Sequence, residues 1–189
     1  MKFQMLALSS LLLLGGAPVV FAANPAAHHV ATPAAKDLAK VNPSYQLRVS
    51  GAVKTQKTFN VAALKQLTAR NSGPMDVVCA SGQVKDKANN YRGVLLTDVL
   101  DAAVIDQKAH KDDRRMVIVA RATDGYTVTF SWSELYNSEI GKQVLVAWEK
   151  DGKPLSVGEG QMLLISGKDI KTGPRHVPNL SALEVVRMK

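Results

Sequence analysis

Short apolar runs separated by polar loops make up most of the chain beyond about residue 44. Many of these runs are β-branched or alternate apolar with polar positions, and both patterns are typical of β-strands. They predict strands at 45–49, 77–78, 91–96, 116–120, 126–130, 144–148, 162–165 and 183–188. No long helix separates consecutive strands at regular intervals, which argues against a doubly wound parallel sheet. The predicted fold class is therefore α+β, with a large β component.

Three short helices are predicted, each after a polar residue that can cap its first turn. They are expected at 61–67 after Asn60, at 98–103 after Thr97 and at 132–136 after Ser131. Ser131 also has Glu134 three residues later, which completes a capping box. The segment from Ala80 to Asn90 is polar and lacks apolar periodicity, so we expect an irregular loop there.

The first 22 residues carry the pattern of a cleavable signal peptide. Lys2 precedes an apolar run that is too short to span a membrane, and Val20 and Ala22 suit a cleavage site. No later segment is long and apolar enough to cross a bilayer. We expect cleavage after Ala22 and export to the periplasm. An Ala- and Pro-rich flexible arm over 23–43 and one folded domain over 44–189 would follow.

The chain is basic, with 24 Lys and Arg residues against 16 Asp and Glu residues and a formal net charge of +8. A basic exported protein favours anionic ligands or membrane headgroups. The basic residues are interspersed along the chain, without the dense run that is typical of nucleic-acid binding. We therefore expect no nucleic-acid partner.

Cys79 is the only cysteine and directly follows the apolar residues Val77 and Val78. A single cysteine cannot form an internal disulfide, and in an oxidising compartment burial or a metal would protect its thiol. A thiol at the end of a strand, beside a polar loop, suits a metal ligand or a nucleophile. The same position suits an ordinary buried cysteine, which packs as a small hydrophobic residue. The residues alone leave both interpretations open.

A second stretch that could carry chemistry runs from 167 to 176, and it could meet the Cys79 loop at one site. Its glycines, Gly167 and Gly173, allow close approach of another backbone. Its charged side chains and its imidazole can hold an anionic group such as a phosphate through charge-assisted hydrogen bonds. These residues are Lys168, Lys171, Arg175 and His176. The alternative is a solvent-exposed loop that only joins two strands.

Motifs of several other enzyme classes are missing from the sequence. It contains no H-E-x-x-H, no G-x-S-x-G and no Walker loop. Cysteine hydrolase chemistry would require Cys79 to meet His110 or His176, and no local signature supports such a pair.

Five segments in order carry a resemblance to a known family. They are Val78-Cys79, 91–100, 124–126, 151–155 and 162–165. Their order and spacing resemble the molybdopterin-binding domain of the sulfite oxidase family of oxidoreductases, from about Tyr45 to Met188. The resemblance implies a single α+β domain of mixed β-sheets with short helices.

The resemblance also implies a cofactor and its ligands. In catalytic members of the family a cysteine thiolate ligates molybdenum beside the dithiolene of molybdopterin, and Cys79 matches that position. A soft thiolate suits this metal, and coordination deprotonates it. Lys168, Lys171, Arg175 and His176 match the part of the domain that supplies cofactor-facing residues. A redox partner would then exchange electrons with the metal.

The chain departs from the family in two respects. Members that oxidise sulfite hold the anion with an arginine-bearing segment after the cysteine, whereas residues 80–84 contain no arginine, which argues against sulfite as the substrate. The leader also lacks the twin arginine of enzymes that are exported folded around their cofactor.

Some small exported members resemble pterin-binding modules that signal to membrane-bound regulators of cyclic-dinucleotide turnover. This alternative would use a free pterin without metal and would need no redox catalysis.

Overall fold

The computed structural model describes residues 43–189. The predicted signal peptide, and the predicted arm up to residue 42, lie outside the described residues. The strands are β1 (Leu47–Gly51), β2 (Lys57–Phe59), β3 (Ala69–Asn71), β4 (Met75–Val78), β5 (Val84–Ala88), β6 (Tyr91–Leu95), β7 (Met116–Ala122), β8 (Thr127–Ser131), β9 (Val144–Lys150), β10 (Lys153–Pro154), β11 (Leu163–Ser166) and β12 (Leu180–Arg187). The helices are α2 (Val61–Leu64), α3 (Leu96–Ala103) and α4 (Trp132–Tyr136), with 3-10 turns η1 (Asp112–Arg115), η2 (Gly141–Gln143) and η3 (Gly173–Arg175).

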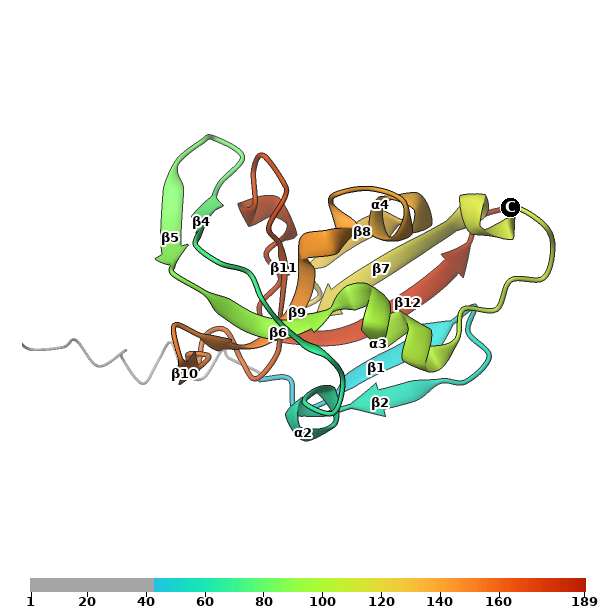
Figure 1. Ribbon diagram of the computed structural model, residues 1–189, viewed down its shortest axis with the longest axis horizontal. Coiled ribbons are helices and arrows are strands. Elements are labelled where there is room, and N and C mark those ends of the chain that lie inside the picture. Colours follow the sequence, from blue (N-terminus) through green and yellow to red (C-terminus); the bar gives the residue numbers. More distant parts are fainter. Residues whose placement is uncertain (1–42) are drawn as a thin grey trace, which may run out of the picture. The chain divides into compact units, whose positions relative to one another are not determined.

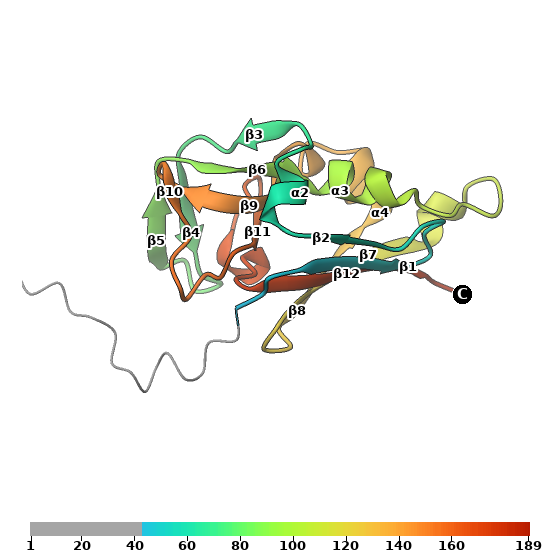
Figure 2. The same cartoon turned by 90° about the horizontal axis from the view of Figure 1, so that it is seen from below.

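Most of the strands belong to two sheets that lie in separate layers (Figure 1, Figure 2). One sheet has the order β2-β1-β12-β7-β8. The other has the order β10-β9-β6-β3, with β11 paired to β9. β4 and β5 form a separate two-stranded hairpin. β1 and β12 pair in parallel, with Val49 opposite Leu183. Every other pairing between the named strands of residues 43–189 is antiparallel.

Strand β9 is buried on both faces because it contributes to two hydrophobic cores. Val144, Val146 and Trp148 pack into the main core, which also receives side chains from β1, β7, β12 and α3. Leu145 and Ala147 point the other way, into a smaller core that contains Tyr91 and residues of β11. Successive side chains of a strand point to opposite faces. A strand buried on both sides therefore has a continuous apolar run rather than an alternating pattern.

The predicted α+β class is confirmed, and every predicted strand overlaps an observed one. The expectation of an irregular loop from Ala80 to Asn90 is wrong. β5 lies within it and pairs antiparallel with β4, with Met75 opposite Ala88. Most side chains of β5 are exposed or half-buried, so the segment lacks the apolar alternation that usually marks a strand.

The capping box is confirmed. The hydroxyl of Ser131 accepts from the backbone N–H of Glu134 at 3.1 Å, and the carboxylate of Glu134 accepts from the backbone N–H of Ser131 at 2.8 Å. Asn60 also caps α2 as predicted, since its side chain accepts from the N–H of Ala63 at 2.8 Å. This helix ends at Leu64, before the predicted end at residue 67.

The prediction that Thr97 caps the second helix is wrong. α3 begins at Leu96, directly after β6, and its N-cap residue Leu95 makes no side-chain capping bond. Burial of Leu96, Val99 and Leu100 in the main core stabilises this helix in place of a polar cap. No helix within residues 43–189 has the length and apolar character needed to cross a membrane.

Candidate functional site

Cys79 lies where β4 ends and the hairpin loop begins. Its N–H donates to the carbonyl oxygen of Gln83 at 2.9 Å, and its own carbonyl oxygen accepts from the N–H of Gly82 at 2.8 Å. Gly82 has a φ of +90°, which side-chain-bearing residues rarely adopt. This is a three-residue hairpin loop closed by a left-handed glycine. The two hydrogen bonds fix the backbone from which the Cys79 thiol projects.

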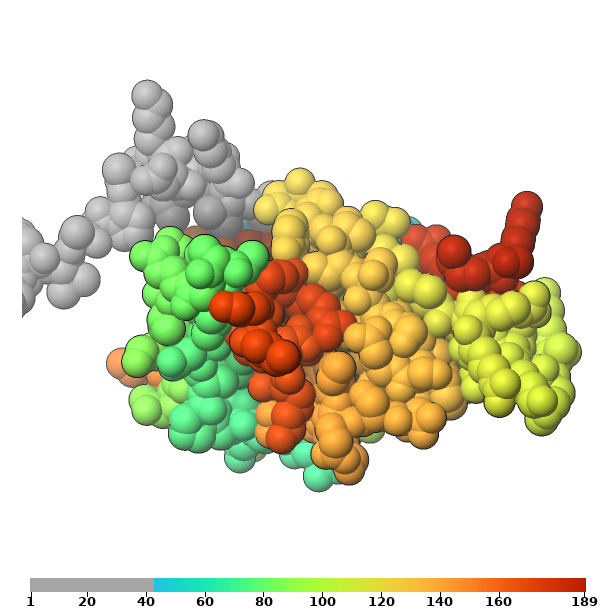
Figure 3. All heavy atoms as spheres, turned by 90° about the horizontal axis from the view of Figure 1, so that it is seen from above, coloured from blue at the N-terminus to red at the C-terminus, as the bar shows by residue number. Residues whose placement is uncertain are grey.

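The loop between β11 and β12 packs directly against Cys79. The hydroxyl of Thr172 accepts from the N–H of Val78 at 2.9 Å and donates to the carbonyl oxygen of Asp76 at 2.6 Å. A Cβ added to Gly173 would lie 2.8 Å from the carbonyl oxygen of Val78 and 3.3 Å from Cα of Cys79. Only glycine permits so close an approach. The prediction that the two stretches meet is therefore confirmed, and Figure 3 shows the loop beside the hairpin.

A cavity of about 730 Å³ opens beside Cys79. Its lining comes from both stretches and from the turn before β8, and includes Val77, Cys79, Ser81, Tyr126, Gly173 and His176. Cys79 is half-buried and makes no disulfide. Its thiol is thus accessible from a concave surface large enough for a small-molecule ligand.

His176 is the residue of this cavity with the clearest unmet hydrogen-bonding capacity. Its Nδ1 is buried and has no hydrogen-bond partner within the described residues. Burial lowers the pKa of His176, while the nearby carboxylates of Glu159 and Asp86 partly offset that effect. The imidazole is therefore neutral at pH 7 and offers one donor and one acceptor. A buried polar atom without a partner is typical of a position that a ligand or ordered water completes.

A second cavity, of about 690 Å³, is also lined by His176. The two cavities share His176 and Pro178. In contrast to the Cys79 cavity, this one is lined by several charged side chains, among them Asp86, Lys150 and Glu159.

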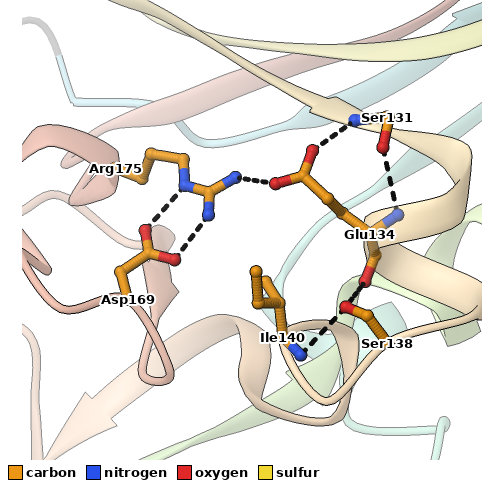
Figure 4. A network of polar contacts seen from close by, with 6 residues as sticks. All are labelled: Ser131, Glu134, Ser138, Ile140, Asp169 and Arg175. Atoms are coloured by element: carbon orange, nitrogen blue, oxygen red, sulfur yellow. Dashed lines mark hydrogen bonds and ion pairs between the residues drawn. The ribbon is translucent and has the colours of Figure 1, made fainter.

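Arg175 does not line either cavity. Its guanidinium forms a bidentate ion pair with Asp169, with Nε 2.6 Å from the carboxylate, and its Nη1 lies 3.0 Å from the carboxylate of Glu134 (Figure 4). The guanidinium also lies over the ring of Phe130, 4.3 Å from its centroid. These contacts attach the loop after β11 to α4 and β8. The structure thus gives Arg175 a role in holding the loop, and its assignment as a cofactor contact stays a prediction.

The two predicted lysines lie on the exposed side of the same loop. A Cβ added to Gly82 would lie 2.9 Å from Nζ of Lys171, so this ammonium group lies against the Cys79 hairpin loop. Lys168 lines neither cavity, and it contributes, after Lys142, to lowering the pKa of Glu139. The structure therefore brings Cys79, Lys171 and His176 together and leaves Lys168 and Arg175 at the periphery.

The sequence model of the oxidoreductase molybdopterin binding domain matches residues 29–164, which is most of the chain. The chain belongs to this family. The resemblance to the sulfite oxidase family is thereby confirmed.

A solved relative within this fold is the sulfane dehydrogenase SoxCD from Paracoccus pantotrophus. The two chains superpose with a TM-score of 0.60 at 17% sequence identity, over 75% of this chain and 38% of the other. The similarity confirms the sulfite-oxidase-type fold. The chain thus spans well under half of the length of that relative. No curated protein matches the chain in sequence.

The residues at the site fit the family's cofactor on three observations. Cys79 offers a soft thiolate ligand for molybdenum. The cavity beside it accommodates a pterin-sized group, and buried Nδ1 of His176 lacks a partner. No group of three or more His, Cys, Asp or Glu residues that could hold a metal is present within residues 43–189. A molybdenum ion that carries a dithiolene needs few protein ligands, so a single thiolate is compatible with molybdopterin.

Sequence reasoning missed three residues that the structure places at or beside the site. Thr172 joins the loop to β4 through its hydroxyl. Tyr91 lies edge-on to His176, with ring centroids 6.3 Å apart. Glu159 lines the charged cavity. Tyr91 is hidden in a sequence run that looks like ordinary core, and nothing in the local sequence distinguishes Thr172 or Glu159 from loop residues.

Proposed function

We propose that the protein binds molybdopterin, with the thiolate of Cys79 as a ligand to molybdenum, and acts as a redox protein of the oxidoreductase molybdopterin-binding family. The observation that carries this proposal is the close packing of Gly173 on Val78 and Cys79, which places the thiol and His176 on one cavity. The family's cofactor supplies the capacity to transfer an oxygen atom or electrons when bound. The chain supplies binding, orientation and charge.

Two side chains would contribute most to holding such a cofactor. Neutral His176 can donate to or accept from a pterin through its partnerless Nδ1. Lys171, over the hairpin loop, can bind a phosphate by a charge-assisted hydrogen bond. Lys168 is farther out and would act through longer-range attraction. Arg175 would act indirectly, because its guanidinium is occupied by Asp169 and Glu134.

Sulfite is not proposed as the substrate. None of the described residues that line the Cys79 cavity is an arginine or a lysine. An anionic substrate would therefore lack the bidentate donors that usually recognise such groups.

The lack of Arg and Lys among the described residues that line the Cys79 cavity also favours a second function, a periplasmic pterin-binding module without redox catalysis. Such a module would bind a free pterin without metal and signal to a membrane-bound regulator of cyclic-dinucleotide turnover. It would not require substrate-binding arginines. Export through the predicted signal peptide, with cleavage after Ala22, is part of both proposals. Export as an unfolded chain suits the second function, because free pterin can bind after export.

Elemental analysis for molybdenum, together with fluorescence of the released pterin, distinguishes the two functions. The protein would be purified from its native compartment as wild type, as Cys79→Ser and as Gln83→Ala, a control in the same hairpin whose side chain is exposed and does not line the cavity. Molybdenum near one per chain in wild type and Gln83→Ala, and its loss in Cys79→Ser, is the expected result. Pterin without molybdenum would exclude the redox proposal, and a co-purifying membrane protein would then support the signalling function. Absence of both groups would exclude both functions.

A further inference from the structure

The second cavity lined by His176, which we call the charged cavity, differs in its lining from the Cys79 cavity. It contains three carboxylates and two ammonium groups, whereas the Cys79 cavity has no charged lining residue. The carboxylates belong to Asp86, Asp151 and Glu159. The three carboxylates differ in their burial and in the hydrogen-bond partners of their oxygens.

Two of the three carboxylates are already used by the fold. Asp86 forms an ion pair with Lys150 and accepts from the N–H of Lys87 at 2.8 Å. Asp151 accepts from two successive backbone N–H groups, those of Asn89 and Asn90, at 2.8 and 2.9 Å. The main hydrogen-bonding roles of these two side chains are therefore structural.

Asp151 is exposed and uses only its Oδ1 in its two bonds to the backbone, whereas Glu159 is half-buried. Its Oε2 accepts from the N–H and the hydroxyl of Ser156, at 3.0 and 2.6 Å. Its Oε1 has no hydrogen-bond partner within residues 43–189. The contact with Ser156 holds the carboxylate in place, so the free oxygen is presented at a fixed position on the cavity wall.

Two buried polar atoms of aromatic side chains also lack hydrogen-bond partners within residues 43–189. They are Nδ1 of His176 and the hydroxyl of Tyr91, which is fully buried. Burial raises the pKa of Tyr91, and Glu159 is the charged group that contributes most to the same shift. Tyr91 lies edge-on to His176, with ring centroids 6.3 Å apart, and His176 and Glu159 line the same cavity. His176 and Glu159, which both line the charged cavity, therefore each have an unmet hydrogen-bonding position.

We infer that the charged cavity receives the 2-amino-4-oxo edge of a pterin, and that Glu159 is the residue that selects this edge. The inference rests on the proposed binding of a pterin by the Cys79 site. That edge carries an amino group next to a ring N–H, and the free Oε1 of Glu159 can accept a charge-assisted hydrogen bond from the amino group. A pteridine with a 2-oxo group would instead place an acceptor oxygen against the carboxylate. The partial negative charge of that carbonyl oxygen and the charge of the carboxylate would repel each other, so the cavity would bind such a pteridine more weakly.

The test compares two ligands that differ only at that edge. Pterin carries the 2-amino group and lumazine carries a 2-oxo group. Affinities for the full mature chain would be measured by ligand fluorescence at pH 7. Wild type should prefer pterin by on the order of tenfold to a hundredfold, as expected for hydrogen bonds to a charged group. Glu159→Gln should reduce the preference to about threefold or less, because an amide offers one donor and one acceptor and suits lumazine better.

The matched control is Asp151→Asn, which removes one negative charge from the same cavity. An asparagine keeps the acceptor oxygen that the backbone N–H groups of Asn89 and Asn90 require. The Asp151→Asn variant should keep the preference for pterin. This result would show that the position of the Glu159 carboxylate matters and not the net charge of the cavity. An unchanged preference in Glu159→Gln would overturn the inference while leaving pterin binding intact. Failure of wild type to bind either ligand would overturn the proposed function and this inference together.

Discussion

The backbone N–H of Val78 donates to the hydroxyl oxygen of Thr172 at 2.9 Å, although 94 residues separate the two in the sequence. The same hydroxyl donates to the carbonyl oxygen of Asp76 at 2.6 Å. One buried side chain of the loop after β11 thus satisfies two backbone groups of β4. The position of Cys79 relative to the rest of the site depends on this contact.

Replacing Thr172 by Val keeps the shape of the side chain and removes the hydroxyl. The N–H of Val78 and the carbonyl of Asp76 would lose that partner in a partly buried setting, so the free energy of unfolding should fall by about 1–3 kcal/mol. Urea denaturation measures this change. Thr172→Ser retains the hydroxyl and should lose less than half as much. Equal losses in the two variants would show that the methyl group, and not the hydroxyl, matters.

Replacing Gly173 by Ala should separate the loop from the hairpin. The new Cβ would lie 2.8 Å from the carbonyl oxygen of Val78, and overpacking of this kind destabilises by about 1–3 kcal/mol. We expect faster alkylation of Cys79 by a maleimide and weaker pterin binding. Gly158→Ala is the control, because nothing lies within 4 Å of the position of its added Cβ. An alkylation rate equal to that of wild type would contradict the close packing.

Replacing Arg175 by Met should destabilise the domain, because it leaves the carboxylate of Asp169 without its bidentate partner. The side chains of Arg175 and Asp169 are only 19% and 10% exposed, so the loss should be on the order of 2–3 kcal/mol. Lys142→Met removes a cation from an exposed pair with Glu139, with side chains 70% and 73% exposed, and should change stability by less than about 1 kcal/mol. Thermal unfolding of both variants checks the contrast, and similar melting temperatures would count against a structural role for Arg175.

The stability of the domain should decrease as the pH falls below about 6.5, the ordinary pKa of histidine. Burial lowers the pKa of His176 in the folded state, and Lys150 adds to this, while Glu159 and Asp86 oppose it. Between the lowered pKa and 6.5 the unfolded chain binds more protons than the folded one, so acid favours unfolding. His176→Gln should flatten this part of the pH profile. His110→Gln, at an exposed position, should leave it in place, and a parallel profile for His176→Gln would refute the prediction.

The main elements of the fold could be predicted from the sequence where burial imposes a simple pattern. The runs at 116–120, 144–148 and 162–165 are apolar because their strands are buried, and the capping box at Ser131 is a local contact between neighbours. The meeting of the two site stretches was also predictable in outline. Gly173 marks a place where another backbone approaches closely, and the single cysteine marks a place where a thiol is held.

The parts of the fold and of the site that could not be predicted from the sequence depend on contacts between residues that are distant in the chain. β5 is mostly exposed and is held by pairing with β4, so its own sequence does not identify it as a strand. Arg175 resembles a free cation in the sequence, and only the folded chain brings Glu134 to its guanidinium. The open oxygen of Glu159 is likewise visible only after every other carboxylate of the cavity has been assigned a partner.

The parallel pairing of β1 with β12 has a consequence for the order of assembly. β12 lies between β1 and β7, so this sheet stays divided until residues 180–187 are available. A chain that crosses a membrane unfolded, amino end first, would have to complete this layer on the far side. Contacts between segments so distant in sequence form slowly. The thiol of Cys79 would then reach the exterior before the loop that shelters it, and ligand loading would be the last step of maturation.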